Sequence, residues 1–467
     1  MSRRAVVIGA GLAGMLAAAV LSGAGVDEVI VLDRDELPEG PEHRRGLPQG
    51  RHAHLLMTGG MDAMEELLPG AGLRERLLAA GAHEISLSSG MLARTPEGWL
   101  RRWRRTGPAM VTCSRALLDW VVRTAVRERA PVEIRRAAVV GLTGSAGRVR
   151  GVRITAPGGE TGLEADLVVD ASGRGTRVVG WLGGLGVSGV RERAVDTGLV
   201  NASRVYRVPD GAERFPLTIV QADPYVCRPG RSAMVMPIEG GRWLVSCGGS
   251  RGGEPPADPA GFLRYTLQLP DPIVGRLISG AQPLTDVHLS RSTSNVRRHL
   301  EKLPHWPEGF VVLGDALATF NPAYGHGMSV AAFGARVLAR ELERAGGPTA
   351  PGLARRVLRG VARSADPAWS MAVSQDVLYP GVRGGRPSAG DRVVTAYTRR
   401  MMRAATGSYA AASAIWDVTS LRTSPTRMFR PDAVLAALAG SPLPPSTEPP
   451  LTPDERTLLR GLDRTGV

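Results

Sequence analysis

The chain has 467 residues, of which 43% are hydrophobic and 22% are charged, and this composition excludes a disordered or fibrous protein. No apolar run is long enough for a membrane span, and the first expected strand starts so early that we expect no signal peptide. We therefore expect a cytoplasmic protein with no membrane partner.

The formal net charge of +14 raises the question of a nucleic-acid partner, but the pattern of the basic residues argues against one. Nearly all of them are arginines, Lys302 is the only lysine, and they are spread along the chain except for a local run at residues 101–105. We interpret them as a solvated surface and expect no nucleic acid to bind. Their field could still attract an acidic partner at short range, such as a carrier protein that holds the substrate.

The first 33 residues have the pattern of one strand–helix–strand unit. The apolar run at residues 5–8 predicts a buried parallel strand, the small and aliphatic residues 12–21 predict a helix, and residues 28–33 predict a second strand. This order is that of a Rossmann-type dinucleotide-binding unit.

Gly9, Gly11 and Gly14 form a G-x-G-x-x-G fingerprint at the turn between the first strand and the helix. In this context Gly9 permits the tight turn, Gly11 lets the backbone approach a pyrophosphate, and Gly14 lets the helix pack closely on the strand. The start of the helix offers free N–H groups to the phosphates. Asp33, at the end of the second strand, would accept hydrogen bonds from a ribose hydroxyl, and Arg34 beside it is a further candidate contact. The fingerprint alone leaves both NAD and FAD open.

The middle of the chain changes from helical to strand-like patterns. Helices are expected over residues 57–68 and 115–127, and the segment 190–300 has the short alternating pattern of an antiparallel sheet. Beyond residue 345 the chain is expected to be helical, with residues 441–453 as a mobile linker before a short last helix.

The pattern of a buried strand that ends in a Gly-containing turn occurs at two further places in the sequence. Residues 165–170 predict a strand that ends in the turn 171–175, and residues 310–313 predict a strand followed by Gly314 and Asp315. A carboxylate and exposed backbone groups at strand ends are typical of ligand sites in parallel sheets.

These features resemble the FAD-dependent monooxygenases of the para-hydroxybenzoate hydroxylase type, and the resemblance favours FAD over NAD. In that family a Gly-Asp pair contacts the ribitol of FAD, which implies this role for Gly314 and Asp315. A loop with Pro and Gly then lies beside the flavin. The matching loop residues, which the resemblance places along the isoalloxazine, are Pro322, Gly325, Gly327 and Met328.

The resemblance also implies an arginine on the pyrophosphate. Arg51 is the first choice, with Arg44 and Arg45 as alternatives. Arg115, which opens an expected helix, stands at another position where the family contacts the cofactor. No residue is expected to act as a catalytic acid or base, because the flavin carries the oxygen, and Pro322, Gly325 and Gly327 would only shape the loop beside it.

A narrower resemblance is to the flavin-dependent epoxidases of polyether antibiotic biosynthesis, such as those of the monensin and lasalocid pathways. It rests on four runs of sequence: residues 48–56, 113–120, 236–243 and 321–328. It implies epoxidation of carbon–carbon double bonds in an apolar polyene polyketide, with O2 as co-substrate and a flavin C4a-hydroperoxide as the oxygen donor. The polyene could be carried on an acyl carrier protein.

One position departs from the family pattern. Many relatives have an Asp in the turn near residue 172 that supports both FAD and NADPH, and this chain has Ser172. We therefore expect NADPH or NADH to act through a separate flavin reductase.

Other functions stay open on the sequence. Hydroxylation of an aromatic or enol carbon needs the same oxygen donor, and a geranylgeranyl-reductase-like enzyme would act on similar alkenes without O2. A protein that binds lipids without catalysis is a third class. A halogenase is disfavoured, because the chain lacks a Trp-x-Trp-x-Ile-Pro motif and its only lysine, Lys302, is far from the N-terminal part.

We predict no metal site. His52 and His54 lie two residues apart but have no Cys or carboxylate beside them, and the cysteines at 113, 227 and 247 lack metal-ligand spacing.

The expected fold class is α/β, with a Rossmann-type FAD-binding domain, a β-sheet substrate domain and a C-terminal helical region. The FAD-binding domain is expected to be discontinuous, and the substrate domain mainly β-sheet. The predicted boundaries are 1–82, 106–190 and 300–345 for the FAD-binding domain, 83–105 and 191–299 for the substrate domain, and 346–467 for the helical region.

Overall fold

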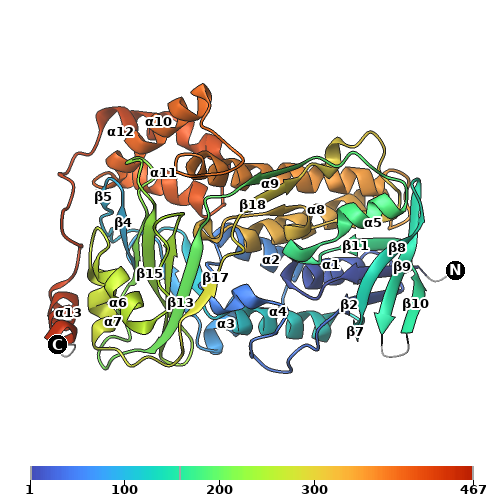
Figure 1. The fold of residues 1–467 in the computed structure, drawn as a ribbon, viewed down its shortest axis with the longest axis horizontal. Coiled ribbons are helices and arrows are strands. Elements are labelled where there is room, and N and C mark those ends of the chain that lie inside the picture. The colour runs from blue at the N-terminus through green and yellow to red at the C-terminus, as the bar shows by residue number, and fades with distance from the viewer. Residues whose placement is uncertain (1–2, 157–158, 465–467) are drawn as a thin grey trace.

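The computed structural model describes residues 3–156 and 159–464, and these form two halves that lie side by side along the long axis (Figure 1). One half is built on a parallel sheet that contains the N-terminal strand, and the other on a largely antiparallel seven-stranded sheet. The described ends of the chain lie at opposite ends of the molecule.

The parallel sheet has five strands in the order β19-β11-β1-β2-β7, and every neighbouring pair is parallel. Its three central strands, β1, β2 and β11, are almost wholly buried, which is why they are continuous apolar runs in the sequence. The bounds are β1 Arg4–Ile8, β2 Glu28–Asp33, β7 Val132–Arg136, β11 Leu167–Asp170 and β19 Phe310–Val312.

Helices cover one face of this sheet, where α1 contacts β1, β2, β7 and β11. α1 packs against both α4 and α8, and α8 packs along α9 (Figure 1). Two helices from beyond residue 326 therefore lie in the same half as the N-terminal strand. α2 and α3 complete this half. The bounds are α1 Leu12–Ser22, α2 Thr58–Leu67, α3 Leu73–Ala79, α4 Arg115–Arg129, α8 Gly327–Ala345 and α9 Leu353–Asp376.

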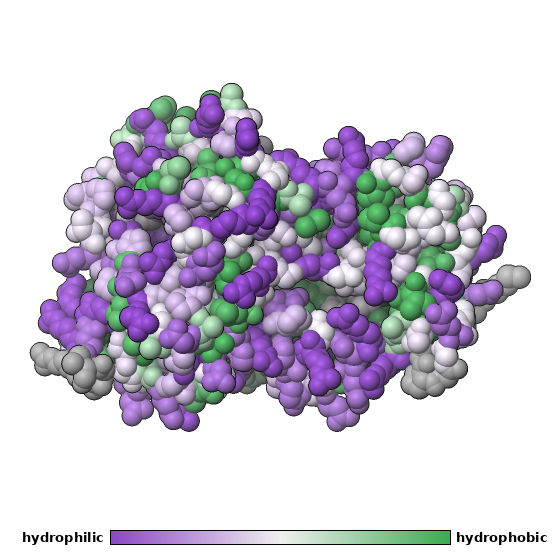
Figure 2. Space-filling view, in the orientation of Figure 1, coloured by the Kyte–Doolittle hydropathy of each residue, from purple (hydrophilic) through white to green (hydrophobic). Residues whose placement is uncertain are grey.

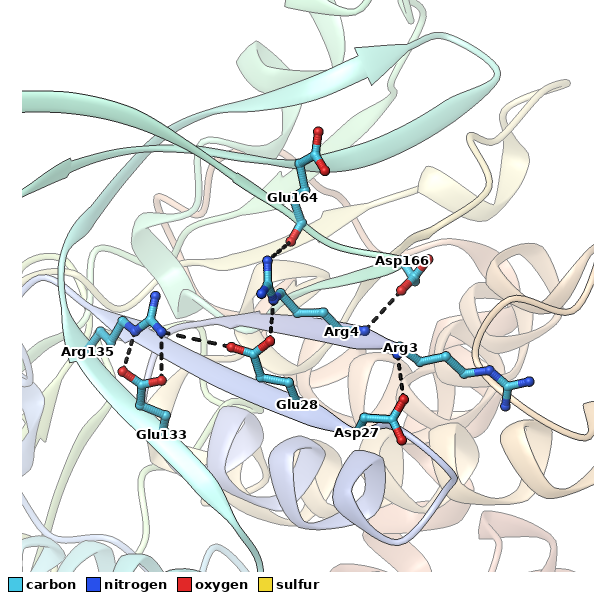
Figure 3. A network of polar contacts seen from close by, with 8 residues as sticks. All are labelled: Arg3, Arg4, Asp27, Glu28, Glu133, Arg135, Glu164 and Asp166. Carbon is cyan, nitrogen blue, oxygen red and sulfur yellow. Dashed lines mark hydrogen bonds and ion pairs between the residues drawn. The ribbon is translucent and has the colours of Figure 1, made fainter. Parts of the chain in front are cut away.

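Charged side chains gather at the amino ends of the parallel strands (Figure 3). The Arg4 guanidinium pairs with Glu28 at 2.6 Å, and the Arg4 N–H donates to Asp166 at 2.9 Å. Arg135 pairs with Glu133 on the same strand, β7. Such part-exposed pairs contribute little each, typically below about 1 kcal/mol. They fasten this edge of the sheet. The turns at residues 9–14, 171–175 and 314–316 lie at the opposite, carboxyl edge.

A three-stranded antiparallel sheet and a short helix flank the parallel sheet. The order of the small sheet is β10-β9-β8, and β9 lies against β11. The bounds are β8 Ala138–Ser145, β9 Arg148–Ala156, β10 Gly159–Glu164 and α5 Val178–Gly184.

The seven-stranded sheet of the second half has the order β17-β13-β16-β15-β14-β4-β5. Its central strands are long and pair in register, whereas β4 and β5 come from a distant part of the sequence and extend one edge. The bounds are β4 Met91–Thr95, β5 Gly98–Trp99, β13 Val200–Arg207, β14 Leu217–Val220, β15 Arg231–Ile238, β16 Arg242–Gly249 and β17 His288–Ser290.

The two faces of this sheet contact different helices, because side chains alternate along each strand. Val235 and Val245, paired across β15 and β16, belong to a core with α6 (Pro259–Leu267), α7 (Ile273–Ser279) and α13 (Pro453–Arg464). Met236 and Leu244, the next pair, belong to a core with α10 (Ala389–Ala405), α11 (Tyr409–Thr419) and α12 (Pro431–Ala439). Figure 1 shows these two groups of helices around the sheet.

The remaining elements connect the two halves. β3 (His83–Ser86) pairs with β6 (Ala109–Thr112), and β12, β18 and β20 form a three-stranded sheet. The other bounds are β12 Glu192–Val195, β18 Asn295–Arg298 and β20 Ala318–Thr319, with single 3-10 turns at Pro48–Arg51, Gly173–Gly175, Leu300–Lys302, Gly314–Ala316, Pro322–Tyr324 and Pro425–Phe429.

The segment 441–453, expected as a mobile linker, lies along the edge strand β5. The Trp99 N–H donates to the Ser446 carbonyl at 3.4 Å, and Arg101 donates to the Pro444 carbonyl at 2.9 Å. An edge strand has unpaired backbone groups, and this segment covers some of them, which the composition of the segment did not indicate.

The expected fold class is confirmed: a Rossmann-type α/β half, a sheet half and C-terminal helices. The helix expected over 57–68 is observed at Thr58–Leu67. The exact domain boundaries stay a prediction. In the view of Figure 2, hydrophilic residues cover most of the surface and hydrophobic ones form small separate patches. Across the described residues, no helix combines the length and the apolar character needed to cross a membrane.

Candidate functional site

The turn after β1 contains three glycines, and at two of them nearby backbone atoms leave no room for a side chain. Gly9 has a φ of +99°, and a Cβ there would lie 2.7 Å from the Ala171 carbonyl oxygen. A Cβ on Gly14 would lie 1.8 Å from the Gly9 carbonyl oxygen. A Cβ on Gly11 would meet nothing within 4 Å. The turn is therefore packed on its inner side and open at Gly11, at the N-terminus of α1.

Asp33 is buried at the end of β2 and bonded to this turn. Its Oδ2 accepts a hydrogen bond from the Ala10 N–H at 2.8 Å and one from Arg44 Nη2 at 2.9 Å. Arg44 also donates from Nη1 to the Ala10 carbonyl at 3.0 Å. The arginine that the structure places at the fingerprint is thus Arg44. Arg34 and Arg45 are exposed on either side of it.

Arg51 and Arg115 lie in different surroundings. Arg51 is exposed, and its Nη1 lies 3.2 Å from His288 Nδ1 on the edge strand β17. Arg115 is 9% exposed at the start of α4, where its Nε donates to Asp119 Oδ1 at 2.8 Å. Arg44 and Arg115 line the same small cavity. The structure therefore brings Arg44 and Arg115 together, while Arg51 points to the sheet half.

The turn after β11 completes this end of the site. The carboxylate of Asp170 accepts hydrogen bonds from the Ser172 N–H at 3.0 Å and from the Ser172 and Thr176 hydroxyls at 2.6 Å each. Burial raises the pKa of Asp170, and these hydrogen bonds counteract the rise. The Ser172 hydroxyl therefore donates its hydrogen bond to Asp170 within the same turn.

Gly314 and Asp315 follow β19 and lie beside the Gly9–Gly14 turn. Gly314 has a φ of +58°, and a Cβ there would lie 3.0 Å from the Cβ of Ala13 on α1. Burial raises the pKa of Asp315, while three cations, Arg174, Arg115 and Arg298, counteract the rise. A Cβ on Gly327 would lie 3.6 Å from Asp315 Oδ1. Asp315 therefore lies between the fingerprint and the start of α8.

Arg174 is a residue that the sequence patterns did not single out as a site residue. It donates from Nη1 to the Ser294 carbonyl at 2.9 Å and from Nη2 to the Phe320 carbonyl at 3.0 Å. It thereby ties the turn after β11 to the strand that precedes the loop 321–327. Burial lowers its pKa, and Asp315 raises it. Its position inside a Gly-rich turn was the only signal in the sequence.

The loop 321–327 lies against the segment 55–57. Gly325 has a φ of +67°, and a Cβ there would lie 3.0 Å from Met57 Cε and 3.3 Å from Leu55 Cβ. Pro322 is exposed, whereas Met328 at the start of α8 is buried. His326 is also buried, and burial lowers its pKa to about 4, so the imidazole is neutral near pH 7.

A buried carboxylate holds this loop in place. Asp376, at the end of α9, accepts hydrogen bonds from Asn295 Nδ2 at 2.6 Å, from Asn321 Nδ2 at 3.0 Å and from the Tyr324 hydroxyl at 2.6 Å. Asp376 is 1% exposed, and burial raises its pKa while these donors counteract the rise. The loop is therefore fixed by a residue more than 50 positions downstream.

The sequence held a signal for Asp376. It lies on the apolar side of α9, in line with Ala365, Ala368 and Ala372, where an ionisable residue is unexpected. A carboxylate on such a face needs partners, which the sequence alone does not name.

His52 and His54 do not share a ligand. His52 Nδ1 lies 2.8 Å from Ser203 Oγ, whereas His54 Nδ1 lies 2.8 Å from the His52 carbonyl oxygen. Burial and nearby Arg115 lower the pKa of His54 to about 3. Within residues 3–156 and 159–464, no group of three or more His, Cys, Asp or Glu side chains is arranged to hold a metal ion.

A separate cavity of about 500 Å³ lies between α8, α9 and residues 421–424. Its lining contains none of the residues described above as site residues.

The sequence matches the family model described as FAD binding domain over residues 3–350. The chain belongs to this family, the para-hydroxybenzoate hydroxylase-like group of flavin monooxygenases. The open backbone at Gly11, the arginines 44 and 115 and the carboxylate of Asp315 fit the pyrophosphate and ribitol of the family's cofactor, FAD. When bound, FAD supplies redox chemistry that no side chain of this chain offers.

Comparison with individual proteins agrees with the family. Protein Rv3254 of Mycobacterium tuberculosis (strain ATCC 25618 / H37Rv) is 32% identical over 398 residues, which cover 80% of each chain. A triple mutant of the flavin-dependent brominase Bmp2 has 16% identity and a TM-score of 0.61, with 98% of this chain and 99% of that chain covered. PqsL of Pseudomonas aeruginosa, a probable FAD-dependent monooxygenase, has 18% identity and a TM-score of 0.58, with 80% and 94% covered. These two structures share the fold.

Gly11 and Gly14 give a matched pair of substitutions. Gly11→Ala should fold normally, because its Cβ meets no atom, but should lower FAD affinity about tenfold or more, a loss of about 1.4 kcal/mol or more. Gly14→Ala should destabilise the fold itself, by roughly 3 kcal/mol, because its Cβ overlaps the Gly9 carbonyl. FAD titration and thermal unfolding measure both. Full FAD affinity in folded Gly11→Ala would show that the site is misplaced.

Asp376→Asn tests the lock on the loop 321–327. Asn cannot accept from all three donors, and each buried donor left unpaired costs about 1–3 kcal/mol. We expect a lower unfolding free energy and faster proteolysis within residues 321–327. Asp366→Asn on the same helix is the control. The side chain of Asp366 is 59% exposed, its 3.5 Å contact with Arg297 can be kept by an amide oxygen, and Arg297 also pairs with Glu301, so this variant should change little. Equal behaviour of the two variants would contradict the proposed lock.

Proposed function

We propose that this protein is a monooxygenase that epoxidises carbon–carbon double bonds of an apolar polyene polyketide. The observation that supports it most is the apolar sheet face beside the loop 321–327. Val205, Ile219 and Met234 on the sheet, together with Leu55, are only partly buried and pack against the same core. Leu55 lies next to Gly325, so this apolar surface adjoins the loop expected along the isoalloxazine.

Bound and reduced FAD, together with O2, supplies an electrophilic oxygen atom for an alkene. The chain's own residues then have two tasks. The Gly-rich turn, Arg44, Arg115 and Asp315 hold the cofactor, and the apolar face holds the alkene and excludes water. No acid–base pair is required for oxygen transfer to an alkene.

We further propose that NADPH or NADH delivers electrons through a separate flavin reductase. Ser172 replaces the Asp that supports NADPH in many relatives, and its hydroxyl is engaged by Asp170 within the turn. An acyl carrier protein is the proposed bearer of the polyene. This partner rests on the net charge of +14 alone, because Arg101, Arg102 and Arg105 of the local arginine run have contacts within the chain.

Hydroxylation of an aromatic or enol carbon is the second candidate, because it uses the same cofactor and the same oxygen donor. The polar end of the sheet face, formed by Ser203, Ser246 and His52, favours it, since such carbons carry an oxygen neighbour.

The two functions are separated by product analysis under 18O2. The FAD-loaded protein is incubated with NADPH, a flavin reductase and either farnesyl acetate, an apolar triene, or 1-naphthol. Epoxidation predicts an 18O-containing epoxide of the triene. Exclusive 18O-hydroxylation of the naphthol would replace the epoxidase by the hydroxylase, and a hydrogenated triene formed without O2 would contradict both.

A further inference from the structure

The cavity of about 500 Å³ beside α8 combines apolar side chains with a ring of arginines. Its volume lies within the range of small-molecule sites, which is roughly 300–1,000 Å³. α8 and α9 form two of its walls, and the loop 421–424 after α11 forms the third. The apolar lining residues, all buried or half-buried, are Val330, Phe333, Val337, Pro367, Ala368 and Leu421.

The charged part of the lining is strongly biased towards positive charge. It consists of five arginines, at positions 336, 340, 344, 363 and 422, and one carboxylate, that of Glu341. Arg336 is half-buried and the other four arginines are exposed. The guanidinium groups therefore surround the opening of a hollow whose deeper side chains are apolar.

Two of these arginines have no partner within the chain. The other three have carboxylate partners: Arg336 with Glu66 at 3.1 Å, Arg344 with Glu341 at 3.0 Å and Arg422 with Asp417 at 3.6 Å. Arg340 and Arg363 have neither a hydrogen bond nor an ion pair with any residue in the ranges 3–156 and 159–464. Their N–H donors are therefore available to a ligand.

The spacing of the arginines on α8 adds a second observation. Arg336, Arg340 and Arg344 follow one another at intervals of four residues, so they lie along one face of the helix, and Arg363 meets this face from α9. Like charges four residues apart destabilise a helix by about 0.2–0.5 kcal/mol per pair. A bound anion would remove this repulsion, and the planar guanidinium fork matches the oxygen atoms of a phosphate group.

We propose that this cavity is a second ligand site, which binds a small organic diphosphate. The phosphate groups lie at Arg340 and Arg363, and an apolar or aromatic body lies against Phe333 and Leu421. The excess of positive charge calls for a ligand with more than one negative charge, and the apolar lining calls for more than an inorganic ion. A nucleoside diphosphate and an isoprenoid diphosphate share this chemistry.

The proposed site is separate from the small cavity that contains Arg44 and Arg115, because the two linings have no residue in common. It does not depend on which carbon the enzyme oxidises. A concave space with apolar walls fits a small molecule better than it fits the flat acidic surface of a protein partner.

The first test is calorimetric titration of the FAD-loaded protein, in which the cofactor already fills its own diphosphate site. The probes are geranyl diphosphate, ADP and inorganic diphosphate, in about 0.15 M salt to screen unspecific attraction. Geranyl diphosphate or ADP should bind, one molecule per chain, at least about tenfold more tightly than inorganic diphosphate, because only these two carry a body for the apolar lining. The tighter of the two identifies the body as an isoprenoid chain or a nucleoside.

A pair of double variants tests the position of the site. Arg340→Ala/Arg363→Ala should weaken binding of the tighter probe at least about tenfold, because charge-assisted hydrogen bonds are lost. Arg359→Ala/Arg392→Ala removes the same charge from exposed positions outside the cavity and should change the affinity less than about twofold. All four arginines are exposed, so both variants should keep their FAD and unfold within a few degrees of the wild type.

The second test uses the wild type and needs no variant. Phenylglyoxal modifies accessible arginines, and the modified positions are read by mass spectrometry. The tighter probe should protect Arg340 and Arg363 from modification, whereas Arg359, one turn before Arg363 on α9, should be modified equally with and without it.

Three outcomes would overturn the inference. Binding of both organic diphosphates no tighter than that of inorganic diphosphate would show that the apolar lining is not used. Equal weakening in the two double variants would show attraction to the overall charge, and modification of Arg340 and Arg363 unchanged by the probe would place the ligand elsewhere. Because no turnover is measured, failure of the proposed epoxidation does not affect these results.

Discussion

The site depends on close approaches at three glycines that leave little or no room for a side chain. Gly14 on α1 meets the carbonyl of Gly9, Gly9 meets the carbonyl of Ala171, and Gly314 lies against the side chain of Ala13. These contacts draw the carboxyl ends of β1, β11 and β19 onto the N-terminus of one helix. Three segments that are far apart in the sequence therefore share one edge, and the charged groups of the site, Arg44, Asp315 and Arg115, gather around it.

The far end of the site depends on the last third of the chain. Asp376 on α9 fixes the loop 321–327 through Asn321 and Tyr324, and α10–α12 cover the sheet face on which the substrate is expected. The loop is thus held by buried polar contacts, and the sheet face is covered by apolar packing. Such contacts are costly to break one at a time, because each leaves a partner unsatisfied.

Local spacing was enough to predict the fold class and the strand ends. Gly9 to Asp33 and Gly314–Asp315 are contained in single strand–turn units, so their places in the fold follow from patterns within a few residues. Residues whose roles depend on distant partners were not predicted in the same way. The sequence offered Arg44 only as an alternative to Arg51, and the contact of Arg44 with Asp33 appears only in the structure. The contacts of Asp376 and Ser203 cannot be read from local patterns. Asp376 bonds to Asn321, which is 55 positions away, and Ser203 bonds to His52, which is 151 positions away.

The cofactor-binding end and the proposed substrate face also differ in how far local sequence patterns predict them. The cofactor end is built from glycines and charges in a fixed pattern, and the family match covers it. The proposed substrate face is built from side chains of a sheet, such as Met234 and Val205, and side chains of this kind vary with the molecule bound rather than with the fold. The FAD-binding end therefore follows from membership of the family, whereas the substrate does not.

The most direct test of the account is a titration of the FAD-free protein with FAD, FMN and NAD+. If the turn at Gly9–Gly14 binds the pyrophosphate and Asp315 lies at the ribitol, FAD must bind at least about 100-fold more tightly than FMN, a difference of about 2.8 kcal/mol, because FMN lacks the adenylate half. NAD+ should not displace it. Equal binding of FMN and FAD, or displacement of FAD by NAD+, would contradict the placement of the cofactor.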